Sequence, residues 1–175
     1  MTKYMINEQY DVAEAEVSKS FGKGEKREDY ADAWKDTGNV ILVGLPGSGK
    51  MALSELIGER SGMEVVVPES NETAIEFLNG KGRVIVLDDG LVEDQRVYSL
   101  IHGAGKVFYL MTDSNTLSSR VAECEAIEDK EQLWRDLSSR LGVMEPLFYG
   151  TLHFILQATQ SPEEMADDAM EKVAY

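Results

Sequence analysis

Cysteine, histidine and basic residues are all scarce in this sequence. One cysteine, Cys124, and two histidines, His102 and His153, occur among 175 residues. A single cysteine cannot form a disulfide within the chain, and these residues do not have the spacing of a zinc site. Lys and Arg number 17 against 32 Asp and Glu, which gives a formal net charge of −15. Because such a field repels nucleic acids and anionic membranes, we expect neither as a partner.

Long apolar runs are missing as well. No stretch is long enough to span a bilayer, and the start lacks the basic and apolar regions of a secretory leader. A hydrophobic content of 43% over 175 residues is enough for one well-filled core and too little for two. We therefore expect a soluble cytoplasmic protein with one α/β domain, present as a monomer or a weak homo-oligomer.

A glycine-rich turn follows an apolar run and leads into a helix-forming segment, which is the arrangement of a phosphate-binding P-loop. Its residues are Gly44, Leu45, Pro46, Gly47, Ser48, Gly49 and Lys50. The glycines can turn successive backbone N–H groups toward an anion, and the following helix directs its positive end to the same place. Lys50 adds a point charge for the β and γ phosphates. We expect ATP to bind here; the alternative is a chance glycine-rich turn.

The next position departs from the P-loop pattern. Met51 stands where the pattern has Ser or Thr, whose hydroxyl binds the magnesium of the nucleotide. A thioether is a poor ligand for so hard a cation. Nucleotide binding and catalysis therefore need separate arguments.

Two acids follow a buried-type strand, as they do in a Walker B motif. Asp88 and Asp89 come directly after the apolar run 84–87. We predict that Asp88 binds Mg²⁺ and that Asp89, or Glu69 after the preceding strand, takes the proton of an acceptor hydroxyl. The alternative is a solvated turn, for which Asp-Asp-Gly is common chemistry.

Short apolar runs alternate with helix-forming segments along the chain. We expect strands at residues 39–43, 64–67, 84–87, 106–110 and 152–156. We expect helices at residues 51–60, 71–78, 92–102, 117–125, 130–141 and 162–173. This order predicts a doubly wound, five-stranded parallel sheet of the P-loop NTPase type, with ligands at the carboxyl ends of the strands.

The segment before the P-loop strand is a separate question. Residues 1–37 are polar and suggest a helical or mobile N-terminal extension to a kinase-like domain at residues 38–175. This extension covers a sheet edge, docks on a neighbouring subunit or is mobile, and its sequence does not choose among these.

Over residues 39–173 the chain resembles the shikimate kinase family, a branch of the P-loop nucleoside monophosphate kinase fold. The resemblance is carried by the P-loop, by Arg120 in the segment 116–120, by the run Pro-Leu-Phe-Tyr at 146–149, and by Pro162. It implies an ATP-dependent phosphotransferase that uses Mg²⁺, with Arg120 and Pro162 on opposite faces of the adenine.

Several substrate-binding positions of that family are altered here. Its paired acids after the second strand fall on Val67 and Glu69, so the acid on the magnesium side is absent. Its Gly-Gly-Gly turn falls on Asp88-Asp89-Gly90, which places anions where a carboxylate substrate would lie. Its helical substrate-binding subdomain shrinks to residues 70–83.

The family's arginines are altered too. Its lid arginine falls near Ile127, and a substrate arginine falls near Met144, with Arg140 one turn away. We therefore expect a shikimate kinase-like phosphotransferase of altered or reduced activity. The alternatives are an inert nucleotide-binding module that acts through a protein partner, and a P-loop fold without nucleotide affinity that serves assembly. The acceptor is not specified by these residues.

Overall fold

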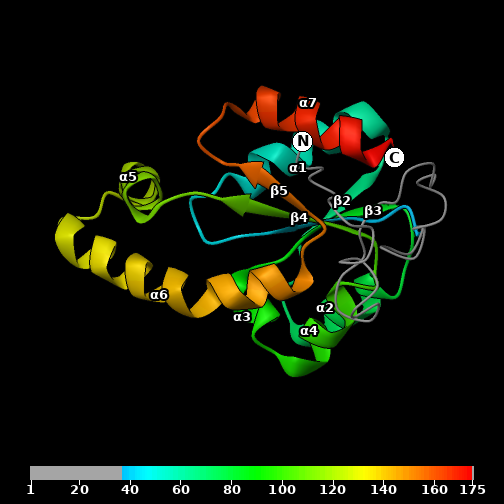
Figure 1. Ribbon diagram of the computed structural model, residues 1–175, viewed down its shortest axis with the longest axis horizontal. Coiled ribbons are helices and arrows are strands. Elements are labelled where there is room, and N and C mark those ends of the chain that lie inside the picture. Colours follow the sequence, from blue (N-terminus) through cyan, green and yellow to red (C-terminus); the bar gives the residue numbers. More distant parts are fainter. Residues whose placement is uncertain (1–36, 175) are drawn as a thin grey trace, which may run out of the picture. The chain divides into compact units, whose positions relative to one another are not determined.

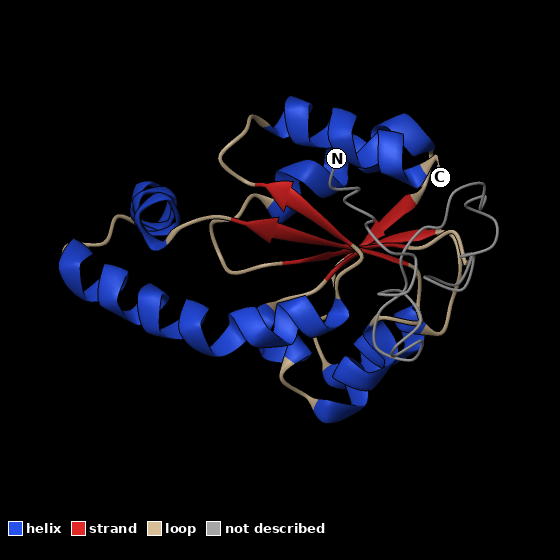
Figure 2. Cartoon of the chain, viewed as in Figure 1, coloured by secondary structure: helices blue, strands red, loops and turns tan. Residues whose placement is uncertain are grey.

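The computed structural model describes residues 37–174, which form a parallel sheet with helices on both of its faces (Figures 1 and 2). The predicted extension at residues 1–37 lies outside this part of the chain except for Thr37. The sheet has the strand order β2-β3-β1-β4-β5, and each pair of neighbouring strands is parallel. Its strands are β1 (Val40–Val43), β2 (Glu64–Val66), β3 (Arg83–Val86), β4 (Lys106–Met111) and β5 (Phe154–Gln157). The predicted doubly wound, five-stranded sheet is confirmed.

The helices divide between the two faces. They are α1 (Lys50–Ser61), α2 (Asn71–Leu78), α3 (Asp89–Val92), α4 (Gln95–Ile101), α5 (Ser114–Glu125), α6 (Lys130–Thr151) and α7 (Pro162–Val173). Figure 1 shows α1 and α7 on one face of the sheet and α2, α3, α4 and α6 on the other. In the part of the chain between residues 37 and 174, no helix is long and apolar enough to cross a membrane.

The central strand β1 explains why both faces need helices. Ile41 and Val43 pack into one apolar cluster, and Val40 and Leu42 pack into the other. All four side chains are buried, as the uninterrupted apolar run requires, because successive residues of a strand point to opposite faces. The carboxyl end of this doubly covered strand leads directly into the P-loop.

Two predicted helices have different bounds in the structure. Of the helix predicted at 92–102, Val92 is the last residue of α3 and the rest begins anew as α4 at Gln95. The side chain of Asp94 accepts hydrogen bonds from the backbone N–H groups of Arg96 and Val97 and so starts α4. The helix predicted at 130–141 continues to Thr151 and passes through Pro146. The last strand accordingly begins two residues later than predicted.

Buried side chains account for the continuation of α6. Proline removes one backbone hydrogen bond from a helix, which costs about 3 kcal/mol. The side chains of Leu137, Met144 and Phe148 lie on one face of α6 and are buried in the core. Because these residues recur at helical spacing, their burial offsets the cost of Pro146.

Met144→Ala should lower the free energy of unfolding by about 2–5 kcal/mol, because it empties a fully buried site on α6. Val143→Ala is the matched control, since the neighbouring side chain is 59% exposed and its removal should change stability by about 0.5 kcal/mol or less. Urea unfolding followed by circular dichroism measures both variants. Equal effects would contradict the orientation of this part of α6.

Candidate nucleotide site

The P-loop connects β1 to α1 in a conformation that requires glycine. Gly47 and Gly49 have φ values of 87° and 91°, in the region that side chains avoid. The N–H of Ser48 donates to the carbonyl oxygen of Leu45 across 3.2 Å, which closes the turn. Gly49 is the N-cap of α1, so the positive end of that helix faces the loop.

The loop also lacks space for larger residues. A Cβ atom at Gly47 would lie 3.1 Å from the carbonyl oxygen of Leu117 and from a methyl group of Val121, both on α5. A Cβ atom at Gly44 would lie 2.9 Å from the hydroxyl oxygen of Ser48. Helix α5 therefore packs directly against the loop.

Ser48 supplies a further sign of an anion site. Its side chain is buried, and its hydroxyl has no hydrogen-bond partner in the described part of the chain. A buried polar group without a partner is costly, and a bound phosphate would accept this hydrogen bond. The surroundings of Ser48 therefore fit a phosphate group.

The ammonium group of Lys50 lies between the ends of β1 and β3. Its Nζ donates to the carbonyl oxygens of Gly44, at 2.5 Å, and Leu87, at 3.2 Å. Burial lowers the pKa of Lys50, and the negative charges of Asp88 and Asp89 oppose this shift. Lys50 is thus held by the P-loop backbone within the field of both acids.

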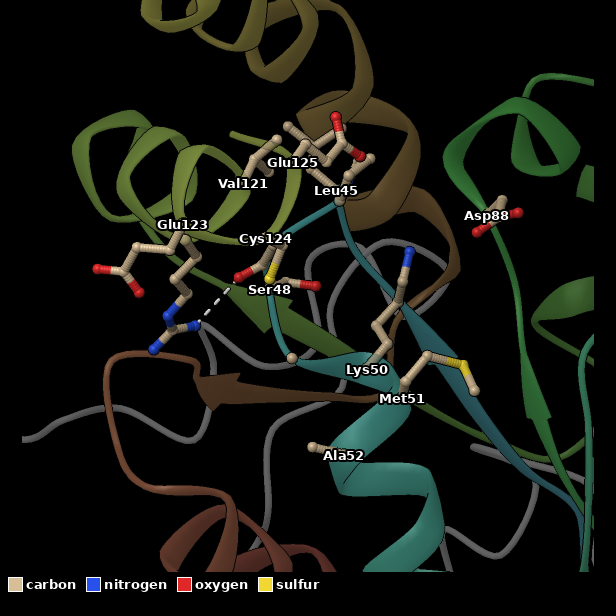
Figure 3. A pocket seen from close by; sticks show the side chains of 14 residues that line it. Leu45, Ser48, Lys50, Met51, Ala52, Asp88, Val121, Glu123, Cys124 and Glu125 are labelled. Carbon is tan, nitrogen blue, oxygen red and sulfur yellow. Dashed lines mark hydrogen bonds between the residues drawn. The ribbon is translucent and has the colours of Figure 1, made fainter. Parts of the chain in front are cut away.

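A cavity of about 450 Å³ opens over the P-loop. Figure 3 shows two charged residues beside this space: Lys50, which lies on α1, and Asp88, which lies in the turn after β3. The residues that line it are Leu45, Pro46, Gly47, Ser48, Gly49, Lys50, Met51, Ala52, Asp88, Arg120, Val121, Glu123, Cys124 and Glu125. The structure therefore brings four of the predicted site residues, Lys50, Met51, Asp88 and Arg120, to one cavity.

Arg120 connects three segments around this cavity. Its Nη1 donates to the carbonyl oxygen of Gly47 at 3.2 Å, and its Nη2 donates to that of Ala158 at 2.6 Å. Arg120 thereby joins α5 to the P-loop and to the segment after β5. Pro162, its predicted counterpart at the adenine, is the first residue of α7 and does not line the cavity.

The other predicted acids lie outside the cavity. Asp89 is the first residue of α3, and its Oδ2 lies 2.6 Å from the Nε of Arg140 on α6. Glu93 pairs with the Nη1 of the same arginine at 2.5 Å. Glu69 is exposed in the loop between β2 and α2. Of the two predicted bases, Asp89 is the one whose charge acts on Lys50.

Sequence reasoning missed the wall formed by α5. Glu123, Cys124 and Glu125 line the cavity, although the acidic run from Glu123 onward is typical of a solvated helix face or lid. Their position within two turns of Arg120, on the helix predicted at 117–125, could have indicated that they lie near the site. The pairing of Arg140 with Asp89 and Glu93 was also missed, because it joins residues 51 and 47 positions apart.

Comparisons with known proteins agree with this geometry. No protein-family model matches the chain. Shikimate kinase 2 of Yersinia enterocolitica is 26% identical over 170 residues, which cover 79% of this chain and 97% of that protein. The shikimate kinase of Acinetobacter baumannii, solved in complex with shikimate, superposes with a TM-score of 0.67 at 19% identity, over 78% of this chain and 92% of that one. The fold is that of a shikimate kinase.

A second solved structure supports the same assignment. Shikimate kinase from Bacteroides thetaiotaomicron superposes with a TM-score of 0.69 at 14% identity, over 78% of this chain and 98% of that one. The resemblance read from the sequence is therefore confirmed. This shikimate kinase-like chain has a P-loop kinase fold, for which a nucleotide is the expected ligand.

Lys50→Met should weaken ATP binding at least tenfold, because it removes the ammonium group at the P-loop and keeps an apolar chain of similar length. Lys81→Met is the control, since Lys81 is exposed in the loop before β3. Isothermal titration calorimetry of both variants measures the affinities, and thermal unfolding checks that each is folded. Equal affinities for ATP would rule out the P-loop as the binding site.

Proposed function

We propose that this chain binds ATP and transfers its γ-phosphoryl group to a small hydroxyl-bearing acceptor, with altered or reduced activity relative to shikimate kinases. One observation carries the proposal: the P-loop, Lys50 and Asp88 border the same cavity. Phosphoryl transfer depends mainly on positioning and on charge stabilisation, and these groups supply both at one place.

The P-loop side of the cavity would hold the polyphosphate. Backbone N–H groups of the loop, the hydroxyl of Ser48 and the ammonium of Lys50 are suitable donors to phosphate oxygens. Lys50 would exchange its carbonyl partners for those oxygens. Arg120 lies at the other side of the loop, where it would contact the base.

Magnesium fits this site with a reduced set of protein ligands. Among the residues that the structure describes, no group of three or more His, Cys, Asp or Glu side chains is placed to hold a metal. Mg²⁺ keeps several waters and needs only one or two carboxylates in addition to phosphate oxygens. Asp88 is suited to this role, and the bound cation would offset negative charge on the phosphates.

The acid positions make shikimate a poor acceptor for this chain. Asp88 and Asp89 stand where the family has glycines, and both would repel a carboxylate substrate. The absence of an arginine at Ile127 would further reduce the rate, because such a group contributes on the order of 10³ to 10⁵ in phosphoryl transfer. Asp89, in the field of Lys50, is a better candidate base than the more remote Glu69.

An inert nucleotide-binding module is the second candidate function. Met51, which lines the cavity where a hydroxyl would bind magnesium, favours it. Val67, at the position of the family's magnesium-side acid, is also exposed. Such a module would bind ATP without turnover and would act through a protein partner.

Asp88→Asn should reduce the effect of Mg²⁺ on ATP affinity about tenfold, because it removes the carboxylate charge from the cavity while keeping its shape. Asp167→Asn is the control, since Asp167 is an exposed residue of α7 that pairs with Arg60 of α1. Calorimetric titrations with and without Mg²⁺ measure the effect. An unchanged metal dependence would remove Asp88 from the site.

A transfer assay distinguishes the two candidate functions. Labelled ATP is offered with a panel of small alcohols, and phosphorylated products are counted for the wild type and for Lys50→Met. Mg²⁺-dependent transfer that disappears in Lys50→Met supports the kinase. ATP binding without any transfer supports the inert module.

Met51→Thr should tighten Mg²⁺ binding in the presence of ATP by about tenfold, because it supplies the missing hydroxyl at the start of α1. Met51→Leu is the control, since it keeps an apolar side chain of similar volume. Magnesium titration at fixed ATP measures both variants. If Thr and Leu behave alike, the identity of residue 51 does not limit metal binding.

A further inference from the structure

Arg140 joins α6 to both ends of α3 through two carboxylates, Asp89 and Glu93. Its Nε lies 2.6 Å from Asp89, and its Nη1 lies 2.5 Å from Glu93. The side chains of Arg140 and Asp89 are 31% and 18% exposed, so this ion pair is largely sheltered from solvent. By contrast, Arg135 on the same helix pairs with Glu131 one turn away, with both side chains mostly exposed.

The charges of this cluster do not cancel. One guanidinium faces two carboxylates, and Asp88 adds a further negative charge at the cavity next to Asp89. The cluster adjoins the proposed phosphate site, because Asp89 directly follows Asp88, which lines the cavity, and its charge acts on Lys50. An acceptor that approaches the cavity past Asp88 therefore meets a net negative field.

We propose that Asp89 and Glu93 mask Arg140, and that this masking restricts the acceptor to compounds without a carboxylate. The inference rests on the proposed phosphotransferase function and specifies its acceptor class as hydroxyl-bearing compounds without a carboxylate. An incoming carboxylate would have to displace two tethered carboxylates, each of which makes a charge-assisted hydrogen bond to the guanidinium. Because Arg140 is already paired, it would not bind the carboxylate of an acceptor, and the site would thereby select against such acceptors.

The test releases Arg140 and asks whether it then binds a carboxylate. Gluconate and glucitol are the probes, because they share a chain of hydroxyl groups and differ by a carboxylate at one end. In Asp89→Asn/Glu93→Gln, the ratio of the affinity for gluconate to the affinity for glucitol should rise at least tenfold above the wild-type ratio. Adding Arg140→Met should abolish the gain.

Two controls separate masking from a purely structural role. Glu131→Gln breaks the exposed pair on α6 and should leave the ratio of the two affinities at the wild-type value. Glu93→Gln alone is a milder variant, because Glu93 is more exposed than Asp89, and it should give part of the gain. Thermal unfolding of every variant identifies any that has lost its fold, in which case Glu93→Gln carries the test.

The inference is overturned if wild type and the double variant have the same ratio of gluconate to glucitol affinity, or if the gain persists without Arg140. A separate ATP titration of the wild type keeps the two proposals apart. If ATP does not bind, the phosphotransferase proposal fails, whatever the gluconate result. If ATP binds and the ratio does not rise in the double variant, only the masking of Arg140 fails.

Discussion

The geometry of the site depends on how the P-loop backbone holds the ammonium group of Lys50. Two carbonyl oxygens, one from the loop and one from the end of β3, hold this buried cation where β1 passes into α1. Positive φ values at Gly47 and Gly49 make the turn possible, and α5 packs against it. Asp88 and Arg120 border the same cavity as this cation, so the position of Lys50 relates them to one site.

The charged residues beside the P-loop cavity distinguish this chain from the shikimate kinase family that it resembles. Asp88 and Asp89 bring negative charge to the edge of the site where the family has glycines. Arg140 neutralises part of that charge from α6, and Glu93 takes the rest of its pairing capacity. Under the proposed function, the site would combine a phosphate-binding loop with an acceptor side whose negative charge disfavours an acid substrate.

Local signals predicted most of the fold. The strand β1 follows from its apolar run, and the helices α2 and α7 begin directly after their capping residues Ser70 and Ser161. The path of α6 through Pro146 was not predictable in this way, because a proline ends a helix unless tertiary packing offsets its cost. The P-loop, the paired acids and the family resemblance predicted that Lys50, Asp88 and Arg120 belong to one site, and the structure places all three at one cavity. The partners of Arg140 depend on how α6 packs against α3, which no local pattern specifies.

The length of α6 has a structural consequence. At about 1.5 Å per residue, its 22 residues form a rod of roughly 33 Å. One end follows the loop after α5, and the other is anchored in the core by Met144 and Phe148. Its first half packs against α5, which lines the cavity. A single helix therefore connects the wall of the cavity to the ion pair between Arg140 and Asp89.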